Sequence, residues 1–284
     1  MNAHSYSLGL YEKSMPNTLS LAEKLRTAKE TGFDFVEISI DETDEKLVRL
    51  DMSPQERCDI VDLMYQEGIR FETMCLSGHR KYPLGSPDPA IRALGLQIME
   101  KAILFARDLG IRVIQIAGYD VYYEESTDET RRLFAEALAV SVKSAAKYGV
   151  LLAFETMETE FLNTVEKAMG WVDRISSPYL AVYPDAGNLT NAAKQYDRDV
   201  LNDIELGHGH IAALHLKETV PGKYREIPFG SGHVNFTSII RKTYGMGNRR
   251  YTAEFWYNGQ EDWKKDIFYA NDFLRKKFLD VGVH

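Results

Sequence analysis

Cysteine is scarce in this sequence, and long apolar stretches are missing. The 284 residues include only Cys58 and Cys75, which form no metal-binding or redox motif and are expected to be reduced, buried thiols. No run reaches the ~18 apolar residues of a membrane span. The first segment, MNAHSYSLGLYEK, lacks the basic start and apolar core of a signal peptide. We therefore expect a cytoplasmic protein.

Positive charge is also in deficit. Lysine and arginine total 34 against 42 acidic residues, which gives a net charge of −8. A nucleic-acid-binding surface needs clustered basic side chains, so this balance argues against such a partner, and nothing indicates a membrane partner. It does not exclude a small phosphorylated ligand, which needs only a few local donors.

The chain contains no linker rich in proline, glycine or serine and no long block of like charge. Hydrophobic residues make up 44% and charged residues 27%, values typical of a globular protein with a sizeable core. Barrels of alternating strands and helices often use about 250 residues as one domain. We therefore expect residues 1–284 to form a single domain.

Eight short apolar runs recur along the chain, and each is typical of a strand. They cover residues 6–12, 33–40, 70–77, 112–118, 150–156, 180–185, 211–217 and 251–256. The stretches between them carry helix signals. Ser20 with Glu23, and Ser53 with Glu56, match capping boxes; Asn163 is expected to cap a third helix.

Strands that alternate with helices form parallel sheets, and eight such units predict a (β/α)8 TIM barrel in the α/β class. An open, doubly wound sheet is the alternative. The absence of a G-x-G-x-x-G turn after the first strand weakens that alternative.

Several strands that otherwise avoid charge carry an ionisable residue near their carboxyl end. Strand 33–40 contains Glu37, and the last four strands contain Glu155, Asp185, His215 and Glu254. Buried charges must be paired or must bind a metal. Residues two apart share a face of a strand, so the last four should meet at the barrel mouth, where barrel enzymes place their chemistry.

Three carboxylates and one imidazole predict a site for one divalent metal ion per chain. Manganese, magnesium, cobalt and zinc all suit this ligand set, and the residues do not choose among them. The alternative is four separate polar groups capped by loop amides. His208 and His210 precede their strand, at the opposite end of the barrel, and are expected to be structural.

Two loops concentrate basic residues and glycine. The loop after the seventh strand contains Lys217, Lys223, Arg225, Gly230 and Gly232, and phosphate is often held at this place in barrels. The loop after the third strand, SGHRKYPLGS, contributes His79 as a further candidate substrate contact. Solvated basic turns are the alternative for both loops.

These motifs together resemble a known family. The strand-end glutamates, YPDAGN, H-x-K and FGSGHVNF are similar to the xylose-isomerase-like barrel superfamily. The segments GFDFVEISIDETDEKLVRLD, MCLSGHRKYPLGS and IRVIQIAGYDVYY resemble, more narrowly, the L-ribulose-5-phosphate 3-epimerases of bacterial L-ascorbate catabolism, which also act on L-xylulose 5-phosphate. The resemblance covers nearly the whole chain.

The resemblance implies a metal-dependent epimerisation at C3 of a phosphorylated L-ketopentose through an enediolate. It implies that Glu155 and Glu254 are the acid and base and also bind the metal, and that Asp185 and His215 are ligands only. We also expect a homodimer. One departure from the family pattern is Glu218, where the resemblance implies aspartate. Its side chain alternates away from the interior, so we expect an effect on residues behind the ligands or on the loop, and no loss of metal binding.

Three other functions stay open. An isomerase, epimerase or dehydratase of an unphosphorylated compound, such as hydroxypyruvate, a free ketose or an inosose, would use the same barrel. A repair endonuclease would need more than the seven histidines present and a basic face. A non-catalytic sugar-phosphate sensor would be expected to have lost one of the four ligands.

Overall fold

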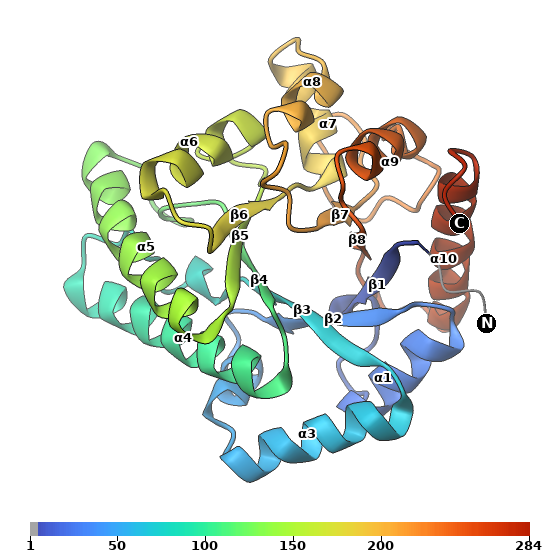
Figure 1. The fold of residues 1–284 in the computed structure, drawn as a ribbon, viewed down its shortest axis with the longest axis horizontal. Coiled ribbons are helices and arrows are strands. Elements are labelled where there is room, and N and C mark those ends of the chain that lie inside the picture. Colours follow the sequence, from blue (N-terminus) through green and yellow to red (C-terminus); the bar gives the residue numbers. More distant parts are fainter. Residues whose placement is uncertain (1–4) are drawn as a thin grey trace.

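The computed structural model describes residues 5–284 as an eight-stranded barrel surrounded by helices (Figure 1). Residues 1–4, which begin the segment that lacks the features of a signal peptide, lie outside that range. The strands are β1 (Ser7–Tyr11), β2 (Phe35–Ile40), β3 (Arg70–Leu76), β4 (Val113–Ala117), β5 (Leu151–Glu155), β6 (Leu180–Tyr183), β7 (Leu214–Leu216) and β8 (Arg250–Ala253). The strands pair in parallel, in the order β6-β5-β4-β3-β2-β1-β8-β7. The predicted TIM barrel is confirmed.

The helices alternate with the strands and cover their outer face. They are α1 (Leu21–Glu30), α2 (Asp44–Leu47), α3 (Pro54–Glu67), α4 (Pro89–Leu109), α5 (Asp128–Tyr148), α6 (Val165–Ile175), α7 (Ala186–Gln195), α8 (Val200–Glu205), α9 (Phe236–Gly245) and α10 (Trp263–Leu279). Three 3₁₀ turns, η1 (Glu12–Ser14), η2 (Val48–Asp51) and η3 (Gly78–Arg80), lie in the loops after β1, β2 and β3. None of the helices within residues 5–284 is long and apolar enough to cross a membrane.

Local signals explain most helix boundaries. Ser20 and Ser53 form the predicted capping boxes at the starts of α1 and α3. Gly68 ends α3 at φ 64°, a left-handed conformation that costs glycine least. The predicted cap Asn163 was wrong: Thr164 caps α6 through Lys167 N, and the Asn163 side chain instead contacts the Tyr196 hydroxyl. Cys75 is buried as predicted, whereas Cys58 is exposed on the outer face of α3.

The seam between β6 and β7 is the weakest part of the barrel wall. Only two isolated bridges cross it, Val182 with Ile211 and Asp185 with His215. From one bridge to the next the chain advances three residues on one side and four on the other, as in a β-bulge. This irregularity shortens β7 relative to the predicted strand 211–217.

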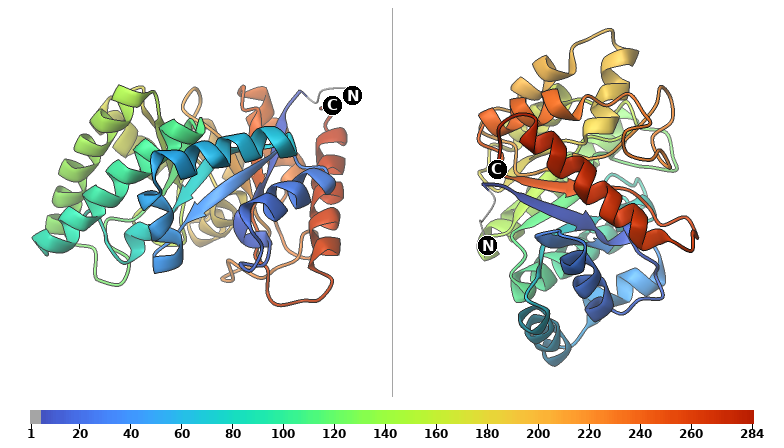
Figure 2. Two further views of the ribbon diagram at one scale, coloured as in Figure 1. Left: turned by 90° about the horizontal axis from the view of Figure 1, so that it is seen from below. Right: turned by 90° about the vertical axis from the view of Figure 1, so that its right-hand side faces the viewer.

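A small apolar cluster lies inside the barrel, whereas the main core lies between the strands and the helices. Ala153, Ala181, Tyr183 and Ala213 pack together inside the barrel, as the predicted alternation requires. The strands run from the side that carries both termini to the opposite side (Figure 2). Residues that follow the strands therefore share one end of the molecule.

Candidate active site and metal centre

The four predicted ligands converge at the carboxyl ends of β5 to β8. Glu155 ends β5, Asp185 follows β6 and caps α7, His215 lies within β7, and Glu254 directly follows β8. One potential ligand atom from each residue lies within 4.8 Å of those of the others, and all four residues are buried. The structure therefore brings together every ligand that the strand-end rule selected.

Asp185 presents one oxygen to the helix and one to the site. Its Oδ1 accepts a hydrogen bond of 2.6 Å from Asn188 N as the cap of α7. Its Oδ2 is buried and has no hydrogen-bond partner among residues 5–284. An unsatisfied carboxylate oxygen in this position is costly unless a cation binds it.

Both glutamates contact the same imidazole nitrogen. His215 Nδ1 lies 3.2 Å from Glu155 Oε1 and 3.5 Å from Glu254 Oε2. Glu155 is held on its other side, because Gln115 on β4 donates to its Oε2 at 2.6 Å. Glu254 has an ammonium beside it instead, since Lys217 Nζ lies 3.3 Å from its Oε2.

These surroundings separate the acidities of the carboxyl groups. Burial raises the pKa of Glu155, and the neighbouring Glu254 adds to this effect. Burial raises the pKa of Asp185 well above its usual value, against the influence of Lys217. Burial also opposes ionisation of Glu254, but Lys217 and His215 outweigh it and lower the pKa of Glu254 to about 2.

The residues present fit a divalent cation. Three buried carboxylates face one another, and Lys217 is the ammonium among them, 3.2 Å from Asp185 Oδ1. Carboxylate oxygens with one imidazole nitrogen form a usual donor set for zinc, manganese or cobalt. A bound cation would satisfy Asp185 Oδ2 and reduce the repulsion between the carboxylates.

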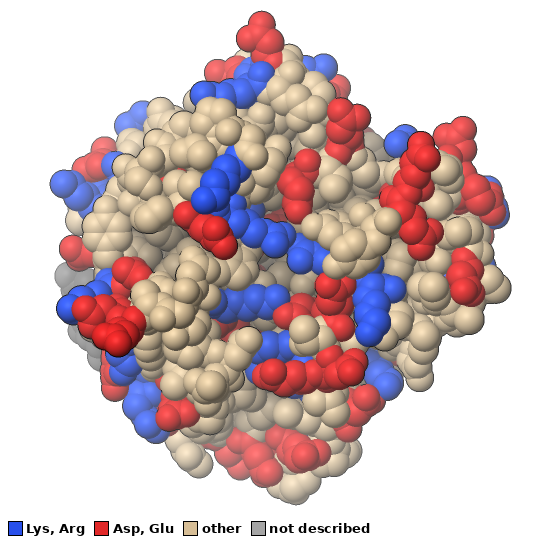
Figure 3. All heavy atoms as spheres, turned by 180° about the vertical axis from the view of Figure 1, so that it is seen from behind, with Lys and Arg blue, Asp and Glu red and all other residues tan. Residues whose placement is uncertain are grey.

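A cavity opens over these residues toward the side shown in Figure 3, where lysine and arginine side chains gather among acidic ones. Glu155 and Glu254 line it together with four cationic side chains, Lys13, Arg80, Lys217 and Arg225. Lys13 is paired with Asp41 at 2.5 Å. The cavity therefore joins a carboxylate-rich base to a cationic wall.

Two of the predicted substrate contacts line this cavity. Lys217 is buried at its base, and Arg225 is partly exposed, with its guanidinium 3.6 Å from Glu158 and 5.3 Å from the centre of the Trp256 ring. Lys223, in the same loop, is exposed and lies 3.8 Å from Glu226. Arg225 is thus the cation of this loop best placed to meet a ligand.

The structure gives the other predicted contacts different neighbours. The His79 ring is buried against α4, where its Nε2 meets the Gly95 carbonyl at 3.1 Å, and it does not line the cavity. Its neighbour Arg80 does. Gly230 N donates to Glu218 Oε2 at 2.9 Å, and a Cβ at Gly232 would lie 2.3 Å from Glu218 Oε1. Both glycines therefore contact the Glu218 side chain within the loop, where an effect of Glu218 was expected.

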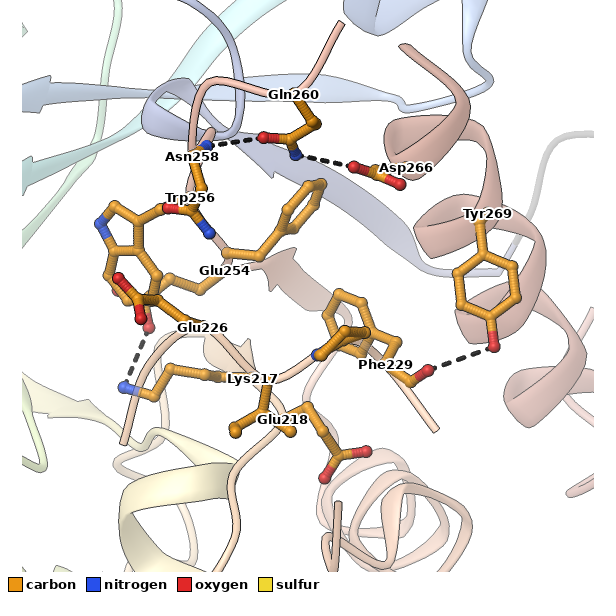
Figure 4. Close-up of a pocket in the computed structure, with 13 residues that line it drawn as sticks. Lys217, Glu218, Glu226, Phe229, Glu254, Trp256, Asn258, Gln260, Asp266 and Tyr269 are labelled. Carbon is orange, nitrogen blue, oxygen red and sulfur yellow. Dashed lines mark hydrogen bonds and ion pairs between the residues drawn. The ribbon is translucent and has the colours of Figure 1, made fainter. Parts of the chain in front are cut away.

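A second pocket adjoins the first behind Lys217 and Glu254 (Figure 4). Its walls include Phe229 and Trp256, and its other charged residues, Glu218, Glu226 and Asp266, are all acidic. Tyr269 closes one side by donating to the Phe229 carbonyl. This chamber is unsuited to a phosphate group.

Sequence reasoning missed Lys13 and Gln115 as members of the site, and from the basic loop after the third strand it chose His79 rather than Arg80. Lys13 would have followed from applying the strand-end rule just beyond the first strand. Gln115 is uncharged and lies in the middle of β4, so that rule does not select it. Arg80 stands next to the residue that was chosen, and nothing local distinguishes the two. The turn η3 decides which of them faces the cavity.

Known proteins resemble this chain over nearly its whole length. L-ribulose-5-phosphate 3-epimerase UlaE of Shigella boydii is 44% identical over 277 residues, which cover 97% of this chain and 96% of that protein. The Shigella sonnei enzyme of the same name is 45% identical with the same coverage.

Solved structures share the fold at lower identity. An L-ribulose 3-epimerase superposes with a TM-score of 0.76 at 20% identity, covering 97% of this chain and 95% of the other. A D-tagatose 3-epimerase-like protein superposes with a TM-score of 0.79 at 18% identity, covering 97% of this chain and 98% of the other. The xylose isomerase-like TIM barrel model matches residues 25–277. On this evidence the chain belongs to the xylose isomerase-like TIM barrel family.

Proposed function

We propose that this protein is a metal-dependent L-ribulose-5-phosphate 3-epimerase, an isomerase that interconverts L-ribulose 5-phosphate and L-xylulose 5-phosphate. The observation that carries the proposal is the 44% identity to enzymes of that name across 97% of the chain. The four buried ligands beneath a cationic cavity support it. L-ascorbate catabolism, a homodimeric state and a cytoplasmic location stay predictions.

The chemistry requires a proton to leave C3 and to return on the opposite face. Glu155 and Glu254 face the cavity from β5 and β8, and each is a candidate to take or return that proton. A divalent cation held by Glu155, Asp185, His215 and Glu254 would supply Lewis-acid stabilisation of the enediolate. Which glutamate takes the proton depends on the direction of the reaction.

Gln115 and Lys217 prepare the two glutamates for these roles. Gln115 fixes one oxygen of Glu155, so the carboxyl group cannot rotate freely. Lys217 keeps Glu254 ionised and is itself buried against carboxylates, with a pKa raised by Asp185 and Glu254 against the opposing effect of burial. Its ammonium is therefore also available to a substrate oxygen at the base of the cavity.

We propose that the phosphate group binds between Arg80 and Arg225. The Arg80 guanidinium has no carboxylate within 4.0 Å among the described residues, and its buried Nε has no hydrogen-bond partner. Its face lies 4.9 Å from the centre of the Tyr122 ring, which holds it in place. Charge-assisted bonds to phosphate contribute about 1.5–3 kcal/mol each, enough to overcome a net negative surface.

Incubation with L-ribulose 5-phosphate and Mn²⁺ in D₂O tests the reaction directly. We expect deuterium at C3, followed by NMR after removal of the metal, together with conversion to L-xylulose 5-phosphate. Chelation should abolish turnover and added Mn²⁺ should restore it. Binding of the sugar without deuterium incorporation would instead identify a non-catalytic sensor.

Comparison with free L-ribulose tests the phosphate site. Arg80→Ala and Arg225→Ala should each lower kcat/KM for the phosphate ester about tenfold or more, and should barely change it for the free sugar. Lys223→Ala is the matched control, because it removes an exposed cation from the same loop. Equal kcat/KM values for both sugars in wild type would favour the alternative of an unphosphorylated ketose.

A further inference from the structure

Glu37 is a buried carboxylate on β2 that lies beyond the four ligands. It is fully buried, and its Oε1 lies 2.6 Å from His215 Nε2. Its Oε2 accepts hydrogen bonds from Thr73 Oγ1 at 2.7 Å and from the Tyr183 hydroxyl at 2.9 Å. Three partners from three other strands therefore hold one carboxylate in the middle of the barrel.

The sheet is irregular at this residue. The register of β2 against β3 shifts between Val36 and Glu37. Val36 pairs with Phe71 and Glu37 pairs with Thr73, so the pairing skips Glu72. Bulges commonly turn a side chain toward a functional site. Here the shift places the Thr73 hydroxyl beside the carboxylate. Tyr183 reaches Glu37 from β6, and its hydroxyl also meets Thr252 on β8 at 2.8 Å.

The contact with Glu37 occupies Nε2 of His215, so Nδ1 is the nitrogen that can bind a metal ion. A carboxylate oxygen accepts and a ring N–H donates, so His215 Nε2 carries the hydrogen in this contact. The opposite nitrogen, Nδ1, is the one that faces Glu155 and Glu254. The ring is thus oriented from behind by a group that does not itself reach the ligand cluster.

We propose that Glu37 is a positioning residue that holds His215 with its hydrogen on Nε2, so that the imidazole binds the cation through Nδ1. This inference rests on the metal site of the proposed function and assigns Glu37 a part in it. Carboxylates that accept the second N–H of a ligating histidine fix its tautomer and orientation, and losing them costs about 10- to 100-fold in metal affinity.

The wild-type protein tests the tautomer by itself. Protein labelled with ¹⁵N in histidine is loaded with Zn²⁺, which is diamagnetic, and the His215 signals are assigned by their absence in His215→Gln. We expect a hydrogen on Nε2 and a metal-bound shift at Nδ1. A hydrogen on Nδ1 with Nε2 bound to zinc would overturn the inference. If wild type bound no Zn²⁺ at all, the metal site itself would fall, and the inference with it.

Calorimetry of Zn²⁺ binding tests the contribution of the carboxylate. Glu37→Gln keeps the shape of the side chain and can still meet both hydroxyls, but it lacks the charge. We expect about 10- to 100-fold weaker binding. Thr73→Val is the matched control, because it removes a partner of the same carboxylate and leaves its contact with His215 in place.

Wild-type affinity in Glu37→Gln, or an equal loss in Thr73→Val, would show that Glu37 is only a packing element. Circular dichroism of the metal-free variants confirms that each is folded. The tautomer measured in wild type decides the question if Glu37→Gln does not fold.

Discussion

Glu155 and Glu254 contact the same imidazole nitrogen but differ in their second neighbour. An amide holds Glu155, whereas an ammonium holds Glu254. Burial raises the pKa of the first, while Lys217 and His215 lower that of the second to about 2 against the effect of burial. Environments that separate two carboxyl groups in this way are typical of acid and base pairs.

Replacing either glutamate by glutamine should stop proton exchange at C3. Glu155→Gln and Glu254→Gln keep approximate shape but remove the proton acceptor and weaken a ligand. We expect kcat to fall by at least about 10²-fold, the lower range for losing a general acid or base. The measurement is C3 deuterium exchange at saturating metal. Exchange at the wild-type rate in either variant would contradict a mechanism with two glutamates.

His79 should make stability depend on pH. Burial lowers the pKa of His79 to about 4, whereas the unfolded residue titrates near 6.5. Between those values the unfolded chain binds more protons, so the folded state loses stability as pH falls from about 6.5 to 4. A shift of this size corresponds to about 3 kcal/mol.

His79→Gln should remove that dependence. The free energy of unfolding of the metal-free protein is measured with urea at pH 7 and at pH 4.5. Its decrease between these pH values should be about 2–3 kcal/mol smaller in the variant than in wild type. His208→Gln, at an exposed site, is the control and should behave as wild type. An unchanged loss in His79→Gln would mean that another group titrates.

At the scale of elements, Glu218 organises the loop between β7 and α9. Its side chain accepts hydrogen bonds from Gly230 N at 2.9 Å and from Val234 N at 3.1 Å. The loop that carries Arg225 therefore closes on a buried carboxylate. This contact gives a physical role to Glu218, at the position where the resemblance implied aspartate.

Glu218→Gln should loosen this loop without removing a ligand. In glutamine an amide nitrogen replaces one carboxylate oxygen and cannot accept a hydrogen bond. Leaving a buried backbone N–H without an acceptor costs about 1–3 kcal/mol. We expect KM for the phosphate ester to rise more than kcat falls, with faster amide exchange over residues 219–234. Glu226→Gln, an exposed change in the same loop, is the control. Unaltered amide exchange in Glu218→Gln would refute the anchoring role.

At the scale of the whole molecule, all four ligands come from the part of the barrel that is least regularly paired. Two isolated bridges join β6 to β7, and the ligands on β5, β6, β7 and β8 lie on both sides of that seam. A cation bound to all four would connect strands that backbone hydrogen bonds connect poorly. Metal binding and the closure of the barrel should therefore be coupled.

Metal should raise the melting temperature, and the rise should continue with the logarithm of the free metal concentration once that exceeds Kd. A ligand that binds only the folded state at 100 times its Kd adds about 2.7 kcal/mol. Asp185→Asn is the informative variant, since asparagine caps a helix as well as aspartate does but lacks the charge. Calorimetric scans with increasing Zn²⁺ should show the shift in wild type and little in Asp185→Asn. Equal shifts in both would place the cation elsewhere.

Much of this protein could be predicted before its structure was known, because the signals are local. Capping boxes at Ser20 and Ser53, and apolar runs that alternate with helices, define the repeating unit within about 35 residues. The same unit places Glu155, Asp185, His215 and Glu254 at one end of the barrel. Each of these inferences needs only a residue and its neighbours in the chain.

Tertiary structure alone decided which side chains meet across the barrel. The register shift at Glu37 and the offset between β6 and β7 change which residues face each other, and neither has a local signature in the sequence. For the same reason Arg80 rather than His79 lines the cavity, and Gly230 serves Glu218. Residue types and spacing selected the metal ligands, but the orientation of His215 depends on a carboxylate 178 residues away in the chain.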